Sequence, residues 1–141
     1  MKYLLDTNLI SEPQRPQPDA RVLQWLFAQE QANLFVSSLV LAEIWQGVLA
    51  LPQSARRLRL EAFARELPSQ YRILNFDLRA ARVWGELVSS HGRGMPILDS
   101  LLAAVALSRG LVVVTRDEAD FRRSGTKVFN PWTMARRAPD G

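Results

Sequence analysis

The run Leu111-Val-Val-Val-Thr115 constrains the fold of this chain more than any other segment. Its consecutive valines favour an extended strand, and the run is too short for a helix of ordinary length. It also lacks the polar and apolar alternation of a strand with one face in water. Uninterrupted apolar strands of this kind occur in parallel sheets that are covered on both faces. We therefore expect an α/β fold with a buried parallel sheet.

Strand-like and helix-like segments alternate along the rest of the chain. Further strands are predicted at residues 2–6, 34–37, 71–76 and 126–130. Helices are predicted at residues 19–30, 39–51, 54–67, 77–90 and 97–109. Asp19 and Asp77 are suited to cap the N-terminal ends of two helices, and Gly110 the C-terminal end of the last. This alternation implies βαβ units and a mostly parallel sheet with helices on both sides, in a single domain of residues 1–141.

The composition excludes several classes of protein. The chain has 141 residues, 48% of them hydrophobic and 23% charged, as in one ordinary globular domain. It has no cysteine and one histidine, which excludes a disulfide scaffold, a cysteine nucleophile and a zinc site of thiolates or several histidines. The apolar run at residues 3–5 stops at Asp6, too soon for a signal peptide, and no stretch approaches the roughly 18 apolar residues of a membrane helix. We expect a soluble, cytoplasmic protein without a membrane partner.

The positive charge is concentrated in one segment. Eighteen basic and fourteen acidic residues give a net charge of +4. Residues 56–82 contain seven arginines and three acids, and 7 − 3 = +4 equals the charge of the whole chain. Arginine pairs well with phosphate, so a polyanionic partner is one interpretation. A solvated helix face is the other, and it is the simpler one unless another feature demands a nucleic acid.

Two acids lie inside otherwise apolar helices. Glu43 is the only charged residue in the helix predicted at 39–51, and Asp99 is the only one between residues 97 and 107. A helix that is apolar all round is normally buried on most sides, and a carboxylate is almost never fully buried without a partner. Each of these acids therefore needs a cation, a proton or a cleft.

Other acids follow the predicted strands. Asp6 ends the first strand, and Asp117 and Asp120 follow the run at 111–115. Ligands of open parallel sheets bind outside the carboxyl ends of the strands, so Asp6 and Asp117 would face one crevice if their strands are neighbours. Glu43 and Asp99 lie early in their helices and could lean over the same edge.

An all-oxygen ligand set of this kind suits Mg²⁺ or Mn²⁺, which can activate water for phosphodiester cleavage. Each acid except Glu43 also has a simpler explanation. Asp99 could be held by backbone N–H groups of the first helical turn, and Asp6 could be a turn acid bonded to Asn8. Asp117 or Asp120 could cap a short helix. The set of acids is more informative than any one of its members.

Four sequence blocks, in order and at typical spacing, resemble the PIN-domain ribonuclease toxins. They are Leu5-Asp6-Thr7-Asn8, Ser38-(x4)-Glu43, Asp99-(x2)-Leu102-Ala-Ala104 and Thr115-Arg-Asp117-(x2)-Asp120-Phe121. The segments Ile10-Ser-Glu-Pro13, Arg15-Pro16 and Phe129-Asn-Pro-Trp132 are similar to the FitB and VapC type. The resemblance covers nearly the whole chain.

This resemblance implies a PIN-like three-layer α/β/α sandwich and an endoribonuclease that depends on Mg²⁺ or Mn²⁺. It also implies the toxin of a type II toxin–antitoxin pair: a homodimer that acts on RNA, is blocked by a small DNA-binding antitoxin, and contacts operator DNA only through that complex. Asp6, Glu43 and Asp99 match the three best-defined acids of the family. Asp117 matches the fourth where the motif is Thr-Arg-Asp, whereas other members have an acid at the position of Asp120.

The resemblance further implies that Asn8, Thr115 and Ser38 support the acids. Two rival interpretations remain open. One is a catalytically silent PIN-fold protein that only binds nucleic acid. The other is a different α/β phosphoryl-transfer domain, but a haloacid-dehalogenase-like phosphatase needs an acid at Asn8, and a receiver domain needs a lysine where Thr115 and Arg116 stand. Neither phosphoryl-transfer fold explains Glu43.

Overall fold

Short parallel strands form one sheet in the computed structural model, which describes residues 1–90 and 94–134. The strands of this described part are β1 (Tyr3–Leu5), β2 (Leu34–Ser37), β3 (Arg72–Leu74), β4 (Val112–Val114) and β5 (Val128–Phe129). Their order is β3-β2-β1-β4-β5, and every pair is parallel. Leu4 of β1 lies opposite Phe35 of β2 and Val113 of β4. The predicted parallel sheet is confirmed.

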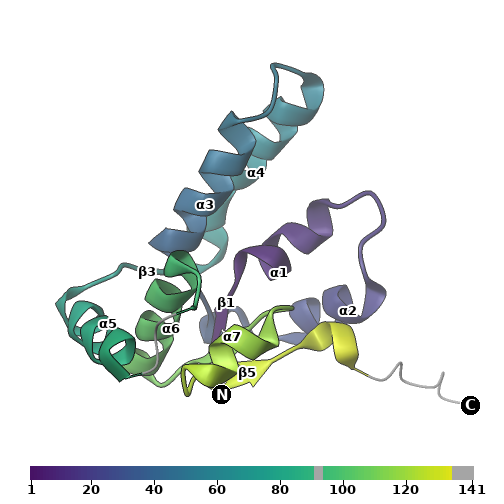
Figure 1. Cartoon of the computed structure of the whole chain (residues 1–141). Coiled ribbons are helices and arrows are strands. Elements are labelled where there is room, and N and C mark those ends of the chain that lie inside the picture. The colour runs from purple at the N-terminus through teal and green to yellow at the C-terminus, as the bar shows by residue number, and fades with distance from the viewer. Residues whose placement is uncertain (91–93, 135–141) are drawn as a thin grey trace, which may run out of the picture.

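Helices cover both faces of this sheet. They are α1 (Thr7–Ser11), α2 (Ala20–Ala28), α3 (Ser38–Leu49), α4 (Ala55–Gln70), α5 (Leu78–Ser90), α6 (Ile97–Arg109) and α7 (Glu118–Arg123), with short 3-10 helices η1 (Glu12–Gln14), η2 (Gln31–Asn33) and η3 (Pro131–Thr133). The chain crosses the sheet in one direction from β1 to β3 and returns past β1 to β4 and β5. Because crossovers between parallel strands are right-handed as a rule, this reversal puts the helices before β3 and those after it on opposite faces. The result is the expected three-layer α/β/α sandwich. In Figure 1, α3 and α4 rise together as a hairpin beyond the other elements.

The two central strands account for the apolar run that predicted the fold. Leu4 and Leu5 of β1, and Val113 and Val114 of β4, are fully shielded from solvent. Because β1 and β4 are neighbours in the middle of the sheet, both faces of each strand pack against helices, so neither tolerates polar alternation. Among the described residues, no helix is long and apolar enough to cross a membrane.

Several predicted boundaries are wrong. The strands predicted at 71–76 and 126–130 are shorter, at Arg72–Leu74 and Val128–Phe129. Tyr71 and Asn130 beside these strands are also extended, but the strands comprise only residues that pair with a neighbouring strand, and that pairing is not visible in one sequence. The helix predicted to end at residue 67 continues to Gln70, with Pro68 inside it. Pro68 has no N–H to bond the carbonyl of Ala64 and its ring crowds that carbonyl, and the helix ends two residues later.

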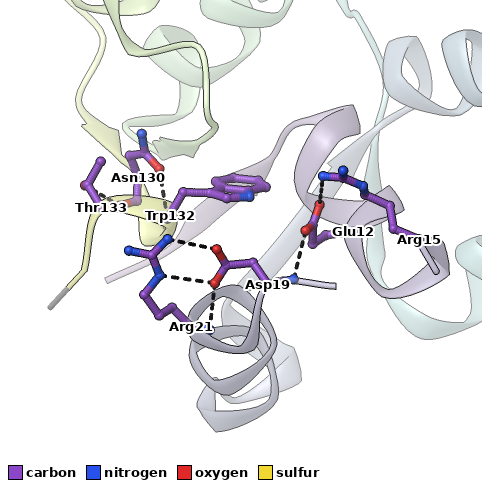
Figure 2. Close-up of polar contacts among 7 residues, drawn as sticks. All are labelled: Glu12, Arg15, Asp19, Arg21, Asn130, Trp132 and Thr133. Atoms are coloured by element: carbon purple, nitrogen blue, oxygen red, sulfur yellow. Dashed lines mark hydrogen bonds and ion pairs between the residues drawn. The ribbon is translucent and has the colours of Figure 1, made fainter. Parts of the chain in front are cut away.

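A network of polar contacts fixes the proline-rich connection between α1 and α2 (Figure 2). Glu12, only 2% exposed, accepts a hydrogen bond from the backbone N–H of Asp19 at 3.0 Å and pairs with Arg15 at 3.3 Å. Asp19 caps α2, as predicted, by accepting from the backbone N–H of Arg21. The guanidinium of Arg21 also pairs with Asp19 and holds the pKa of this carboxyl down at about 2. The burial of Glu12 is not predicted from the sequence, because its backbone partner at Asp19 lies seven residues away across three prolines.

Candidate active site

Asp6 is the most deeply buried acid at the carboxyl edge of the sheet. It follows β1 directly and begins α1, where its Oδ1 accepts a hydrogen bond from the backbone N–H of Thr7 at 2.8 Å. The residue is 7% exposed, and this burial raises the pKa of Asp6 above its ordinary value. Because α1 begins directly after β1 ends, the residue between them, Asp6, has its carboxylate fixed at the edge of the sheet.

Thr115 connects the ends of the two central strands. Its side chain is fully buried, and its Oγ1 donates a hydrogen bond to Oδ2 of Asp6 at 2.7 Å. The same oxygen accepts from Nδ2 of Asn8 at 3.3 Å and from the backbone N–H of Asp117 at 3.0 Å. Because both of its acceptor positions are used, the single hydroxyl proton points to Asp6. This donated bond opposes the rise in the pKa of Asp6.

Asn8 bridges the same two segments but does not bond Asp6. Its Nδ2 lies 3.4 Å from Oδ2 of Asp117, and its Oδ1 accepts from the backbone N–H of Arg116 at 3.4 Å. The simple explanation of Asp6 as a turn acid bonded to Asn8 is therefore wrong. Asn8 and Thr115 instead connect Asp6 and Asp117 at one edge of the sheet, where the resemblance implied supporting residues.

Glu43 and Asp99 approach this edge from the start of two helices. The hydroxyl of Ser37 caps α3 by accepting from the backbone N–H of Leu39 at 3.1 Å, and Glu43 follows in the second turn. Asp99 lies in the first turn of α6. Both acids are partly exposed, and neither makes a hydrogen bond or ion pair with any residue of the described ranges. The alternative in which backbone N–H groups satisfy Asp99 is therefore wrong.

The electrostatics show that these acids converge. The pKa of Asp99 is raised to about 6, first by burial and then by the negative charges of neighbouring acids. Those neighbours are, in order of effect, Asp6, Asp117, Glu43 and Asp120. The charges of Glu43 and Asp117 likewise raise the pKa of Asp6. Segments from four parts of the chain thus bring their carboxylates within mutual electrostatic reach.

The structure separates the two candidates for the fourth acid. Asp117 is exposed and contacts Asn8 and Thr115, so it belongs to the network around Asp6. Asp120 lies one turn further along α7, where its carboxylate pairs with Arg123. Although Asp117 occupies the N-cap position of α7, its side chain makes no capping bond. This geometry favours Asp117 over Asp120.

Ser38 has a weaker connection to the site than the other supporting residues. It is the first residue of α3 and is partly exposed, and no hydrogen bond of its hydroxyl is found with the described residues. Its neighbour Ser37 is fully buried and caps the helix that carries Glu43. Ser37 therefore positions the helix, and this role is indicated in the sequence by a serine at the end of an apolar strand and before an apolar helix.

The donor set fits a hard cation that is only partly enclosed by protein. Carboxylate and hydroxyl oxygens are the groups that Mg²⁺ and Mn²⁺ prefer. Within residues 1–90 and 94–134, no three acidic or histidine side chains are close enough to enclose an ion by themselves. An open set of this kind suits a cation that keeps several waters and shares its coordination with a substrate phosphate.

The arginines of residues 56–82 do not form one uniform patch. Arg57 and Arg65 both pair with Glu61, at 2.8 and 3.6 Å, and Arg82 pairs with Glu86 at 3.2 Å. The others have no carboxylate partner among the described residues, and they are Arg56, Arg59, Arg72 and Arg79. The solvated face therefore describes part of the segment, and the arginines without a partner are the ones that a polyanion could reach.

The fold and this acidic edge define a PIN-type domain. A family model described as PIN domain matches residues 3–126, and the chain belongs to this family. The plasmid stability protein StbB of Pseudomonas syringae pv. tomato is 38% identical to it over 92% of this chain and 97% of its own length. The VapC ribonuclease Y4jK of Sinorhizobium fredii is 37% identical over 94% of this chain and 99% of its own length.

Solved structures show the same similarity in three dimensions. FitAcB from Neisseria gonorrhoeae has a TM-score of 0.86 and 34% identity, covering 94% of this chain and 99% of its own. FitAB bound to an IR36 DNA fragment also has a TM-score of 0.86, with 33% identity over 96% of this chain and 99% of its own. The resemblance to the VapC and FitB type that the sequence blocks predicted is confirmed.

Proposed function

We propose that this chain is an endoribonuclease that depends on Mg²⁺ or Mn²⁺ and acts as the toxin of a type II toxin–antitoxin pair. The observation that carries the proposal is the convergence of Asp6, Glu43, Asp99 and Asp117, in which the other three acids help to raise the pKa of Asp99 to about 6. A protein gains nothing in stability from gathering unpaired carboxylates, so the arrangement calls for a cation. The ribonuclease name of the relative Y4jK is in keeping with this chemistry.

In the proposed site the four acids hold the cation directly or through water, and the supporting residues fix their positions. When bound, such an ion lowers the pKa of a coordinated water and stabilises the leaving oxygen of a phosphodiester. Thr115 keeps Asp6 oriented through its donated hydrogen bond, and Asn8 holds Asp117 beside it. The described residues around these acids include no histidine or lysine in contact with them, so no side chain is assigned as a general base.

The partners follow from the same proposal. The chain would act on RNA in the cytoplasm as a homodimer, and a small DNA-binding antitoxin would block its acidic site. Operator DNA would be contacted only through the complex with that antitoxin. The similarity to a FitAB structure that contains a DNA fragment supports this assignment.

Cleavage of RNA by purified protein tests the activity. Wild type and Asp99→Asn are incubated with total RNA and Mg²⁺ or Mn²⁺, with EDTA as the metal-free control. We expect cleavage by wild type that EDTA abolishes, and a loss of at least about 100-fold in Asp99→Asn, which corresponds to roughly 3 kcal/mol of transition-state stabilisation. Circular dichroism checks that the variant is folded. Cleavage undiminished in Asp99→Asn would refute the site assignment.

A second experiment separates the enzyme from a silent nucleic-acid-binding protein. Wild type and Asp6→Ala are expressed from an inducible promoter in cells that lack an antitoxin. Growth arrest and loss of a specific RNA are expected for wild type alone. Equal growth with equal amounts of both proteins would favour the binding protein over the toxin.

A further inference from the structure

A groove adjoins the acidic edge and leads away from it. It has a volume of about 920 Å³ and lies between the α3–α4 hairpin on one side and α1 with η1 on the other. Glu43 lines the groove, as does Thr7, the residue that follows Asp6. The groove is therefore continuous with the site at which a phosphodiester would be cut.

The residues that α3 and α4 contribute form one continuous face on each helix. Glu43, Ile44, Gly47 and Val48 line the groove from α3, with Leu51 just beyond its end, and Arg56, Arg59, Leu60 and Phe63 line it from α4. The two helices form a hairpin, so Phe63 lies toward the base of the hairpin and Arg56 toward its tip (Figure 1). With a rise of about 1.5 Å per residue, Arg59 lies about 6 Å and Arg56 about 10 Å beyond Phe63 along the helix.

The charges in this groove are unbalanced. Arg56 and Arg59 are exposed and have no carboxylate partner among the described residues, whereas Glu61 on the same helix pairs with Arg57 and Arg65. On the opposite wall Arg15 also lines the groove, and its partner Glu12 holds it in place (Figure 2). Glu43 is the one acid among the residues that line the groove. Two guanidinium groups one helical turn apart are thus left free to bind an anion.

We infer that this groove holds the strand of the substrate RNA next to the cleaved phosphodiester, with Arg56 and Arg59 binding its phosphates. This inference rests on the proposed ribonuclease function. Planar guanidinium groups suit phosphate oxygens, and the apolar floor with Phe63 offers a surface for bases without selecting their sequence. The carboxylates at one end of the groove would repel an acidic protein segment. They favour instead an RNA strand, whose phosphodiester would lie at the proposed cation site.

Two pairs of variants test this placement, each with a matched control. Arg56→Gln/Arg59→Gln removes two free arginines from the groove, and Arg72→Gln/Arg79→Gln removes two free, exposed arginines elsewhere. Gly47→Leu fills the groove without changing charge, and Gly85→Leu makes the same change inside α5. A Cβ atom at either glycine meets nothing within 4 Å, so both leucine variants are expected to fold.

Binding is measured with a short fluorescein-labelled single-stranded RNA of mixed sequence, in an Asp99→Asn background that prevents cleavage. We expect Arg56→Gln/Arg59→Gln to weaken binding roughly tenfold, as loss of charge-assisted hydrogen bonds implies. The slope of log affinity against log salt should fall in magnitude by about 1.4, at about 0.7 for each phosphate contact of a single strand. Gly47→Leu should also weaken binding, and both controls should match the Asp99→Asn parent within about twofold. In the cleaving enzyme, the double groove variant should raise KM more than it lowers kcat.

Two results would overturn the inference. One is that the groove variants and their controls bind RNA with equal affinity, and the other is that the Asp99→Asn parent does not bind RNA. A poly-glutamate peptide that binds the parent but not Arg56→Gln/Arg59→Gln, with unchanged RNA binding, would assign the groove to an acidic protein segment instead. Failure of wild type to cleave RNA would count against the proposed function itself. The binding assay in the Asp99→Asn background does not depend on cleavage, so the two failures can be told apart.

Discussion

At the scale of single residues, the site depends on one buried hydroxyl. The hydroxyl of Thr115 can donate one hydrogen bond, and it donates this bond to Asp6, because its oxygen already accepts from Asn8 and from the backbone N–H of Asp117. The resemblance to a known family implied that Asn8 and Thr115 support the acids. The direction of the Thr115 hydrogen bond and the absence of a bond between Asn8 and Asp6 required coordinates.

Replacing Thr115 with valine should lower the free energy of unfolding more than the same change at another buried threonine. Thr115→Val leaves Oδ2 of the buried Asp6 carboxylate without a donor, while Oδ1 keeps the backbone N–H of Thr7, and we expect the free energy of unfolding at pH 7 to fall by about 2–3 kcal/mol. Thr126→Val is the control, because Thr126 is also buried but bonds the hydroxyl of Ser124 at 2.7 Å, and about 1 kcal/mol is expected there. Urea denaturation measures both. Equal losses would show that Thr115 contributes only as an ordinary buried hydroxyl.

The carboxylate of Asp99 should destabilise the metal-free protein at neutral pH. Its pKa is about 6 in the folded state against 3.8 in an unfolded chain, so between these values the folded protein binds a proton that the unfolded chain has lost. Its contribution to stability is therefore greatest below pH about 4 and is lost as the pH rises to about 6. In EDTA at pH 7, Asp99→Asn should be more stable than wild type by about 1 kcal/mol, after allowance for solvent screening of a partly exposed group.

This difference should disappear at acidic pH. Urea denaturation of wild type and Asp99→Asn across pH 4 to 8 in EDTA measures it, with Asp77→Asn as a comparison. The pKa of Asp77 is lowered by the backbone N–H of Ala80 and by Arg109, so this variant should lose stability at neutral pH. An Asp99→Asn variant that is less stable than wild type at pH 7 would contradict the clustering of acids.

At the scale of elements, the sequence predicted each strand and most helices, because their signals are local. Each of these signals depends on a few neighbouring residues only. Examples are the apolar run of β4, the helix cap at Asp19 and the left-handed conformation of Gly110. The pairing of Glu61 with Arg65, an acid four residues before a base on one helix, is also a local signal. The free arginines of the groove were not readable, since the packing of α3 on α4 decides which face of α4 lies open.

Two glycines in or beside helices should respond to alanine in opposite directions. Gly47 lies inside α3 with open space around it, so Gly47→Ala should raise the free energy of unfolding by about 0.5–1 kcal/mol. Gly110 ends α6 with φ +65°, a conformation that alanine adopts at a cost, so Gly110→Ala should lower it by about 1 kcal/mol. Urea denaturation measures both changes. Destabilisation by Gly47→Ala would mean that the groove face of α3 is packed rather than open.

At the scale of the whole molecule, the sheet order explains how acids far apart in sequence meet. β1 and β4 are paired although more than a hundred residues separate them, so Asp6 and Asp117 lie at one edge. The sequence predicted that strand ends would carry the site but not which strands would be neighbours. The resemblance to a known family supplied that arrangement as an expectation, and the sheet order confirms the neighbouring strands.

The central claim is that these separate acids together hold one kind of divalent ion. Anomalous X-ray scattering from a crystal of the wild-type protein soaked in MnCl₂ tests it most directly. The account predicts an anomalous peak bounded by the carboxylates of Asp6, Asp99 and Asp117, with Glu43 in direct or water-mediated contact, and no such peak in Asp99→Asn crystals. A peak at another place, or none at this edge of the sheet, would contradict it.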